Sequence, residues 1–189
     1  MTTLVVDKTA NVSEPGQSPQ ADGPYRRLPA VGDTFARESH IDEQAYSAGT
    51  DPVAFRLGLR DDERLAPVIR AAARRFGWQF PWCPAGGPAL WARGWLRRGT
   101  GIAAGLDAGR RVVTCAEVRP DGNGQVRVTR IVTACEGDPA EPGVALADYP
   151  DLASAGAGEA PLTALAPAIA NAIFAATGQR LHALPPLPG

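Results

Sequence analysis

The feature that most constrains this chain is an apolar segment close to its C-terminus. In "GAGEAPLTALAPAIANAIFAATG", which runs from residue 156 to residue 178, every residue from Ala164 to Ala176 is apolar except Asn171. A helix that is apolar all round has no face to turn toward water, so we expect it to be buried inside the protein. The run is shorter than the ~18 apolar residues that a membrane-spanning helix needs, so we expect no membrane partner.

The bounds of this C-terminal helix depend on a proline. Pro167 fits a helix only in the first turn or at a kink, because proline has no amide hydrogen to donate. The helix therefore either begins near Thr163 or bends at Pro167. Gly178 is the expected end, because glycine readily takes the left-handed conformation that follows many helices.

Two predicted strands precede this helix and give it a surface to cover. The segments "RRVVTCAEV" and "QVRVTRIVTAC" flank "RPDGNG", whose Asp-Gly and Asn-Gly steps favour a hairpin turn. The second segment changes its alternation near Arg130, which predicts a β-bulge or burial on both faces. Residues 101–107 are a candidate third strand, whereas residues 136–160 are predicted to be loop. Because a two-stranded hairpin is marginal alone, we expect the C-terminal helix to pack on it.

The N-terminal half is predicted to be helical. A first helix is expected from Asp33 or Thr34 to Ala48, with Ile41, Ala45 and Ala48 on its apolar face.

Two shorter helices are expected to follow the first. One begins in "TDPVAFRLGLR". There the Asp51 carboxylate can accept hydrogen bonds from the free backbone amides at the helix start, and Pro52 occupies the first turn. The other covers residues 62–76 and ends at Gly77.

These elements predict an α+β fold, with a helical N-terminal half and a small antiparallel hairpin or sheet packed by the buried C-terminal helix. Residues 1–24 are polar and rich in Pro, Gly, Ser and Gln, so we expect a mostly disordered arm with a candidate edge strand at Leu4–Val6. Residues 25–189 are expected to form a single domain.

Charge and cysteine usage exclude several functional classes. The net charge of −1 gives no positive electrostatic potential that would attract a polyanion, so neither nucleic acid nor an anionic membrane is expected as a partner. The first residues lack a secretion signal, which favours a cytoplasmic location. Cys83, Cys115 and Cys135 lack zinc-site spacing, so we expect reduced thiols and no metal held by side chains.

Residues 78–100 hold all four tryptophans together with several prolines and glycines. This composition predicts a loop. Its aromatic side chains either anchor it to the core or to a partner subunit, or form a ligand cage.

Glu159 lies among small residues shortly before the C-terminal helix. A carboxylate near a helix N-terminus is stabilised by the helix dipole, which would be a structural role only. A partly buried glutamate with small neighbours could instead be a general base, since burial raises its pKa and a substrate can approach closely. The residues themselves leave both interpretations open.

Several stretches together resemble a known family. The segment "GAGEAPLTALAPAIANAIFAATGQRLHALP" is similar to the C-terminal end of the molybdopterin-binding subunit of the xanthine dehydrogenase family, in its isoquinoline 1-oxidoreductase and aldehyde oxidoreductase branch. "YRRLPAVGDTFARESHIDEQAYSAGTDPVAFRLGL" resembles its Tyr/Trp-Arg segment, ES-x-IDE helix and DPV-x-FR turn. "VTCAEVRPDGNGQVRVTRIVTAC" resembles its hairpin. The resemblance covers residues 25–184.

The resemblance implies a molybdenum hydroxylase, which hydroxylates an N-heterocycle or an aldehyde oxidatively. In that family the loop glutamate accepts a proton, and the match carries this catalytic role to Glu159. Arg26 matches an arginine near the pterin and the substrate, although it could equally be a solvated loop residue. Gly156 and Gly158 match the glycines of the loop, so these three residues are the candidate cofactor-binding set. The family's metal is held by the pterin sulfurs, and an iron–sulfur subunit accepts the electrons.

The chain is shorter than the family pattern. Arg27-Leu28-Pro29 replaces a Gly-x-Gly, a large internal deletion lies near residues 136–158, and the Gly-rich phosphate loop has no counterpart. Because a large anionic pterin needs many backbone amides and a deep cavity, we expect molybdopterin to bind only together with a partner chain, a larger molybdopterin-binding subunit. The alternative is a non-catalytic remnant or an assembly subunit that no longer binds the cofactor.

Overall fold

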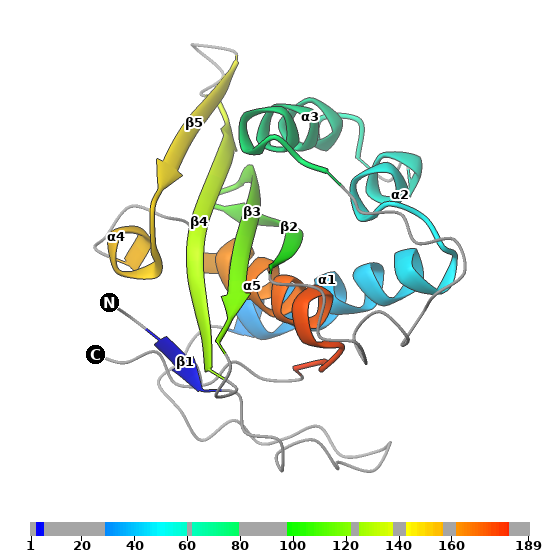
Figure 1. The fold of residues 1–189 in the computed structure, drawn as a ribbon. Helices are drawn as coiled ribbons and strands as arrows, with labels where there is room; N and C mark the ends of the chain where they lie inside the picture. Colours follow the sequence, from blue (N-terminus) through cyan, green and yellow to red (C-terminus); the bar gives the residue numbers. More distant parts are fainter. Residues whose placement is uncertain are drawn as a thin grey trace.

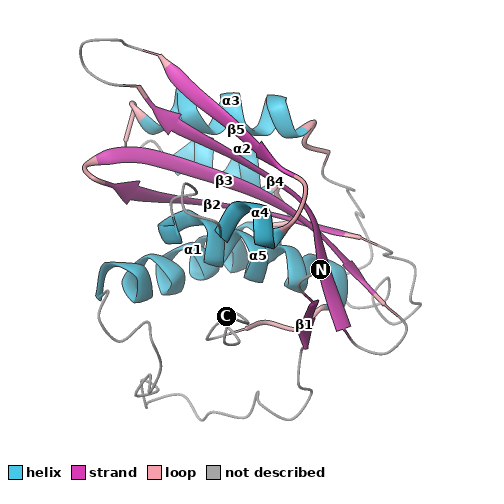
Figure 2. Cartoon of the chain, turned by 90° about the vertical axis from the view of Figure 1, so that its left-hand side faces the viewer, coloured by secondary structure: helices cyan, strands magenta, loops and turns pink. Residues whose placement is uncertain are grey.

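The computed structural model describes residues 3–5, 29–59, 62–79, 98–121, 125–137, 143–156 and 162–181. In this part of the chain an antiparallel sheet lies between two layers of helices. The helices α2 (Pro52–Leu59) and α3 (Leu65–Phe76) cover one face of the sheet. The other face carries α1 (Pro29–Ser47), α4 (Leu152–Gly156) and α5 (Leu162–Thr177) (Figures 1 and 2).

The sheet has the strand order β1-β4-β3-β2, and β5 also pairs with β4. Its strands are β1 (Thr3–Val5), β2 (Gly99–Asp107), β3 (Arg110–Pro120), β4 (Gln125–Glu136) and β5 (Val144–Tyr149). Every pairing is antiparallel. Because β3 occupies one side of β4, β1 and β5 share the other side, and β2 is left as an edge strand of the sheet.

The predicted hairpin consists of β3 and β4, and both alternatives expected near Arg130 occur, a β-bulge and burial on both faces. The register shifts between Glu117, which is opposite Arg130, and the next residue, which is opposite Val128, so Thr129 is the extra residue. The Thr129 hydroxyl lies 2.8 Å from a Glu117 carboxylate oxygen, to which it donates. The extra residue lets Val128 before the bulge and Ile131 after it reach the same apolar cluster.

Several helix boundaries agree with the predicted signals. The Val53 amide donates to Asp51 Oδ1 over 2.7 Å at the start of α2. Gly77 ends α3 with a φ of 69°, and Gly178 follows α5 with a φ of 73°. The α5 helix begins one residue before the expected start and continues through Pro167. No helix in the described ranges is long and apolar enough to cross a bilayer.

The strands β2, β3 and β4 are buried on both faces in their central parts. Together with the helices on both sides of the sheet, this confirms the predicted α+β class with a buried C-terminal helix. The cluster on the α5 face includes Ala103, Ala116, Val118, Ile131, Ile169 and Ile173. The cluster on the α3 face includes Ile69, Phe76, Ile102, Val113, Cys115 and Val132. Alternate residues of each strand therefore enter opposite clusters, which explains why the hydropathy of the central strands does not alternate.

The prediction that residues 136–160 are all loop was wrong. Residues Val144–Tyr149 pair with β4, and residues Leu152–Gly156 form α4. The side chains of β5 are all half-buried or exposed, so the strand is held mainly by backbone hydrogen bonds and lacks the apolar pattern of a buried strand.

The prediction for α1 was wrong in two respects. The helix begins at Pro29, before the expected cap at Asp33, as suits a proline in the first turn. Of the expected apolar face, only Ala45 is buried, whereas Ile41 is half-buried and Ala48 is exposed.

Three glycines of β2 allow this strand to lie directly on α5. A Cβ atom at Gly101 would collide with the backbone of Ala168 and Ala172, and one at Gly99 would collide with the Ala172 carbonyl. At Gly105 it would lie 3.1 Å from the Thr163 hydroxyl. The backbone-to-backbone approach of β2 and α5 thus requires residues without side chains.

We predict that Gly101→Ala lowers the free energy of unfolding by about 2 kcal/mol, because the methyl group overpacks a contact with no free space. The matched control is Gly58→Ala in α2, where a Cβ would meet nothing within 4 Å. That change should raise the free energy of unfolding by up to about 1 kcal/mol, because alanine favours helix. Urea unfolding of both variants checks this. Equal effects of the two substitutions would contradict the close approach.

Candidate functional site

Most of the predicted site residues lie outside the described residues. This holds for Glu159, Arg26 and Gly158, which therefore remain predictions. Gly156 is the last residue of α4.

The described part of the chain nevertheless defines both ends of the segment that carries Glu159. The segment leaves α4 after Gly156 and enters α5 at Leu162. The beginning of α5 lies against β2, because a Cβ on Gly105 would touch Thr163. The Thr163 hydroxyl oxygen is buried and has no hydrogen-bond partner among the described residues.

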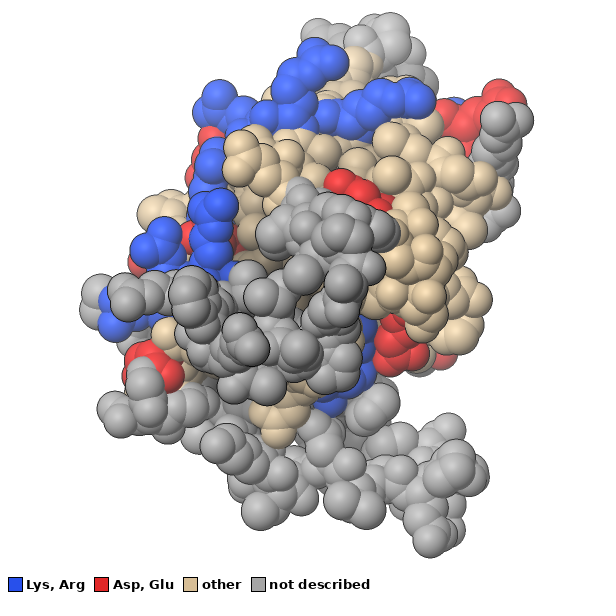
Figure 3. Space-filling view, turned by 45° about the vertical axis from the view of Figure 1, so that its right-hand side comes forward, with Lys and Arg blue, Asp and Glu red and all other residues tan. Residues whose placement is uncertain are grey.

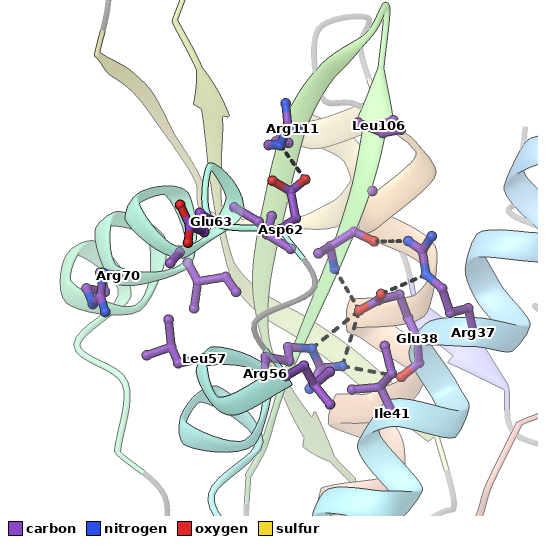
Figure 4. A pocket seen from close by; sticks show the side chains of 16 residues that line it. Arg37, Glu38, Ile41, Arg56, Leu57, Asp62, Glu63, Arg70, Leu106 and Arg111 are labelled. Atoms are coloured by element: carbon purple, nitrogen blue, oxygen red, sulfur yellow. Dashed lines mark hydrogen bonds and ion pairs between the residues drawn. The ribbon is translucent and has the colours of Figure 1, made fainter.

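Gly105 also lines a cavity of about 590 Å³. The cavity is enclosed by α1, α2, the start of α3 and the end of β2 (Figure 4). Because it shares Gly105 with the contact between β2 and the beginning of α5, this cavity is the candidate functional site.

A buried ion pair lies at the base of this cavity. Glu38 of α1 and Arg56 of α2 are 2% and 6% exposed. The Nε and Nη2 atoms of Arg56 both donate to Glu38 Oε2 over 3.3 Å. Nη2 also donates to the Glu38 carbonyl and Nη1 to the Pro52 carbonyl. The pair thereby joins the two helices in one fixed orientation.

The same carboxylate covers the free edge of β2. The Ala104 amide donates to Glu38 Oε2 over 2.8 Å. Arg37 donates to the Ala104 carbonyl and to Glu38 Oε1, each over 3.3 Å. These side chains satisfy backbone groups that an edge strand otherwise exposes to water or to another chain.

A second set of polar contacts connects this pair to α5 and the C-terminal segment. The Asn171 side-chain amide donates to the carbonyls of Ile102 and Glu38, and its oxygen accepts from Arg180 over 2.8 Å. Arg180 also donates to Asp42, which is 1% exposed, over 3.0 Å. Asn171, the one polar residue in the apolar run, is therefore a junction between α1, β2 and the segment after α5.

Three of the resembling stretches meet in this buried polar network. The ES-x-IDE helix contributes Glu38 and Asp42, the DPV-x-FR turn contributes Arg56, and the C-terminal motif contributes Asn171. Sequence patterns alone predicted no role for these residues. The sequence did contain a signal for burial of Glu38 and Asp42, since the two carboxylates are four residues apart and share a helix face with Ala45. Burial of these charges becomes plausible only once their partners are known.

This network has no free group for catalysis. Glu38 Oε2 already accepts from Arg56 and Ala104, so its carboxylate is fully engaged. Burial raises the pKa of Asp42 to about 6, although Arg56 and Arg180 oppose the rise. Asp42 does not line the cavity, and its role is structural.

The cavity mouth is held by a second group of ion pairs. Arg111 of β3 binds Asp62 and Glu136, and Arg64 binds Glu136 as well. The hydrogen bond from Arg111 holds the pKa of Asp62 below its usual range. These contacts attach the start of α3 to the edge of the hairpin, so the cavity has a defined rim.

The described residues do not fit a molybdopterin cofactor. Its phosphate needs several free donors, but the buried Arg56 is engaged by Glu38 and the rim Arg111 by Asp62 and Glu136. The Gly105 backbone pairs with Val112 in the sheet and offers no phosphate-binding loop. Among the residues that the structure covers, no group of three or more His, Cys, Asp or Glu could hold a metal ion.

The cysteine and tryptophan predictions are tested in part. Cys115 and Cys135 are free thiols, and burial raises the pKa of Cys115 far above its usual value. Trp78 packs against Phe76 and donates to Asp51 Oδ1 over 3.1 Å, so it anchors to the core. Cys83 and the other three tryptophans lie outside the described ranges.

We predict that Glu38→Gln lowers the free energy of unfolding by about 3 kcal/mol, because it leaves the buried Arg56 without a counter-charge. The control is Glu43→Gln on the same helix, whose side chain is 43% exposed. It should change the stability by less than about 1 kcal/mol. Chemical unfolding at about pH 7.5 measures both. A Glu38→Gln protein as stable as the control would show that the pair does not hold α1 and α2 together.

We predict that the protein becomes more stable as the pH falls from about 7.5 to about 5, through Asp42. Its folded pKa of about 6 lies above the ordinary value of 3.8, so the folded state binds the proton first. Acidification over this window should therefore add about 1 kcal/mol to the free energy of unfolding. Asp42→Asn should lack this increment. Unfolding curves at several pH values give the difference, and an increment of the same size in Asp42→Asn would refute the assignment.

Comparisons with known proteins give a partial match. A stretch of 54 residues is 44% identical to a subunit of nicotinate dehydrogenase from Pseudomonas putida (strain KT2440). The match covers 29% of this chain and only 4% of that protein. No family model matches the chain, and no solved structure matches it. The similarity supports at most a relationship to a dehydrogenase subunit of this type.

Proposed function

We propose that this chain is a component of a molybdenum hydroxylase-type dehydrogenase and acts together with partner subunits. The supporting observation is the 44% identity to the nicotinate dehydrogenase subunit over 54 residues. The resemblance of the C-terminal stretch to the molybdopterin-binding subunit of the xanthine dehydrogenase family points the same way. The substrate class that follows is an N-heterocycle or an aldehyde.

Glu159 is proposed as the proton acceptor of this reaction. It lies three residues before Leu162 in the sequence, where α5 begins next to β2 and the cavity. The close contact between α5 and β2 fixes the point at which the chain re-enters the fold. A rigid anchor of this kind suits a general base, because proton transfer requires hydrogen-bonding distance to the substrate or to one water.

The cofactor is proposed to be held mainly by a partner chain. Arg26, Gly156 and Gly158 would add contacts to it, but the described residues supply no cradle for its phosphate. When bound, the molybdenum cofactor supplies the two-electron oxidation. A larger molybdopterin-binding subunit and an iron–sulfur subunit are the partners proposed, in keeping with a relative that is itself named as a subunit, and the cytoplasm is the proposed compartment.

A second candidate is a non-catalytic remnant or assembly subunit. It is favoured by the finding that the resembling stretches meet in a buried network with structural roles. Residues of this kind maintain a fold whether or not the chain takes part in a reaction.

The test is turnover of the native complex, purified through a tag on this chain, with Glu159→Gln. We expect kcat to fall by about 100-fold or more, because a general base contributes at least that much. The contents of molybdenum and pterin should stay unchanged. The control is Glu141→Gln, a glutamate near residues 136–158, where the chain is shorter than the family pattern. Equal turnover of the two variants would remove Glu159 from the mechanism, and a complex without molybdenum would favour the remnant.

A further inference from the structure

We propose that the cavity between α1, α2, α3 and β2 binds a small apolar molecule that carries a single negative charge. This ligand site belongs to the chain itself and does not depend on Glu159, on a cofactor or on partner subunits. The inference goes beyond the proposed function and can hold or fail independently of it.

The size and the walls of the cavity suit a small organic molecule. Its volume of about 590 Å³ lies in the range of ligand pockets, which are mainly apolar with a few polar groups. The walls are formed largely by apolar side chains from α1, α2, α3 and β2: Ile41, Leu57, Leu59, Leu65, Ile69 and Leu106. Leu106 is 58% exposed and adds apolar surface at the mouth.

The charges of the described lining residues sum to one excess positive charge. The lining contains Arg37, Arg56, Arg70 and Arg111 against Glu38, Asp62 and Glu63. The neighbouring Glu136 and Arg64 pair with each other and leave this sum unchanged. Two guanidinium groups, those of Arg37 and Arg56, share the Glu38 carboxylate. A monoanion would neutralise the lining, whereas a cation or a dianion would not.

Arg70 is the arginine best suited to bind the anionic group. It lines the cavity from α3 and makes no ion pair or side-chain hydrogen bond with another described residue. Figure 4 shows the Glu38–Arg56 contacts at the base and the Asp62–Arg111 contact above them, with Arg70 on the outer side of α3. Guanidinium groups bind carboxylates through two parallel hydrogen bonds. A free arginine beside an apolar cavity therefore favours ligands that carry a carboxylate.

The same helix supplies a matched control. Arg74 lies one turn after Arg70, is likewise exposed and also makes no ion pair with the described residues, but it does not line the cavity. Arginine side chains form a band over part of the surface in Figure 3. A surface-wide effect of positive charge must therefore affect both positions, whereas a ligand site in the cavity needs Arg70 alone.

The experiment titrates the full chain with benzoate, hexanoate and neutral benzamide at constant salt concentration. Binding is measured by calorimetry and by NMR. We expect saturable binding of an anion with a Kd on the order of 1 mM, as suits so small a ligand. Benzoate and hexanoate distinguish a flat ring from a flexible chain as the apolar part. Arg70→Gln should weaken binding about tenfold, since it removes a charged hydrogen bond. Arg74→Gln should leave binding within about twofold of the wild type.

A filled-cavity variant, Ala66→Trp, places bulk at a half-buried lining position and should abolish binding. Circular dichroism verifies that it folds, and Arg70→Gln decides the matter if it does not. The proposal is overturned if Arg70→Gln and Arg74→Gln lose affinity equally, or if benzamide binds as well as benzoate. Binding that survives in folded Ala66→Trp would also overturn it. Absence of saturable binding for both anions would overturn it as well.

Discussion

The structure depends first on the carboxylate of Glu38, which is buried where α1, α2 and the edge of β2 meet. Burial of a charge is unfavourable unless a counter-charge and hydrogen bonds accompany it. Arg56 provides the charge and the Ala104 amide completes the hydrogen bonds. One carboxylate thus sets the angle between two helices and covers the edge of the sheet. Because the partners come from different elements, the pair forms only when all of them are in place.

The second constraint is the direct contact of β2 with α5. Gly99 and Gly101 allow the strand to approach the helix backbone, and Asn171 donates to the Ile102 carbonyl of that strand. Apolar packing alone would permit small rotations or shifts of an apolar helix on a sheet. The polar contacts at Asn171 select one position, and Arg180 attaches the following segment to the same point. The start of α5, and hence the end of the Glu159 segment, is fixed by this contact.

These constraints place two possible activities next to each other. The segment with Glu159 enters α5 beside Gly105, and Gly105 lines the cavity on which the ligand proposal rests. The cavity has apolar walls, a buried ion pair at its base and a rim of further ion pairs, all formed by residues of this chain. It therefore forms without the family segments that this chain lacks. The pterin proposal differs, because its phosphate would need several free donors at once, whereas Arg56 and Arg111 are engaged in ion pairs. A component that positions an acid and contributes a small-molecule site, while another chain holds the cofactor, accommodates both observations.

Elements whose signals are local could be predicted from the sequence alone. The buried C-terminal helix, the hairpin with its bulge at Thr129 and the end of α3 at Gly77 follow from apolar spacing, turn residues and glycine. The tertiary structure decided which polar residues are buried. Glu38 meets Arg56 across 18 residues, and Asp42 meets Arg180 across 138 residues. It also decided that β5 joins the sheet and that a cavity lies beside α5. Contacts between distant residues have no local pattern, so a charged residue on a helix gives no sign of its burial until its partner is brought to it.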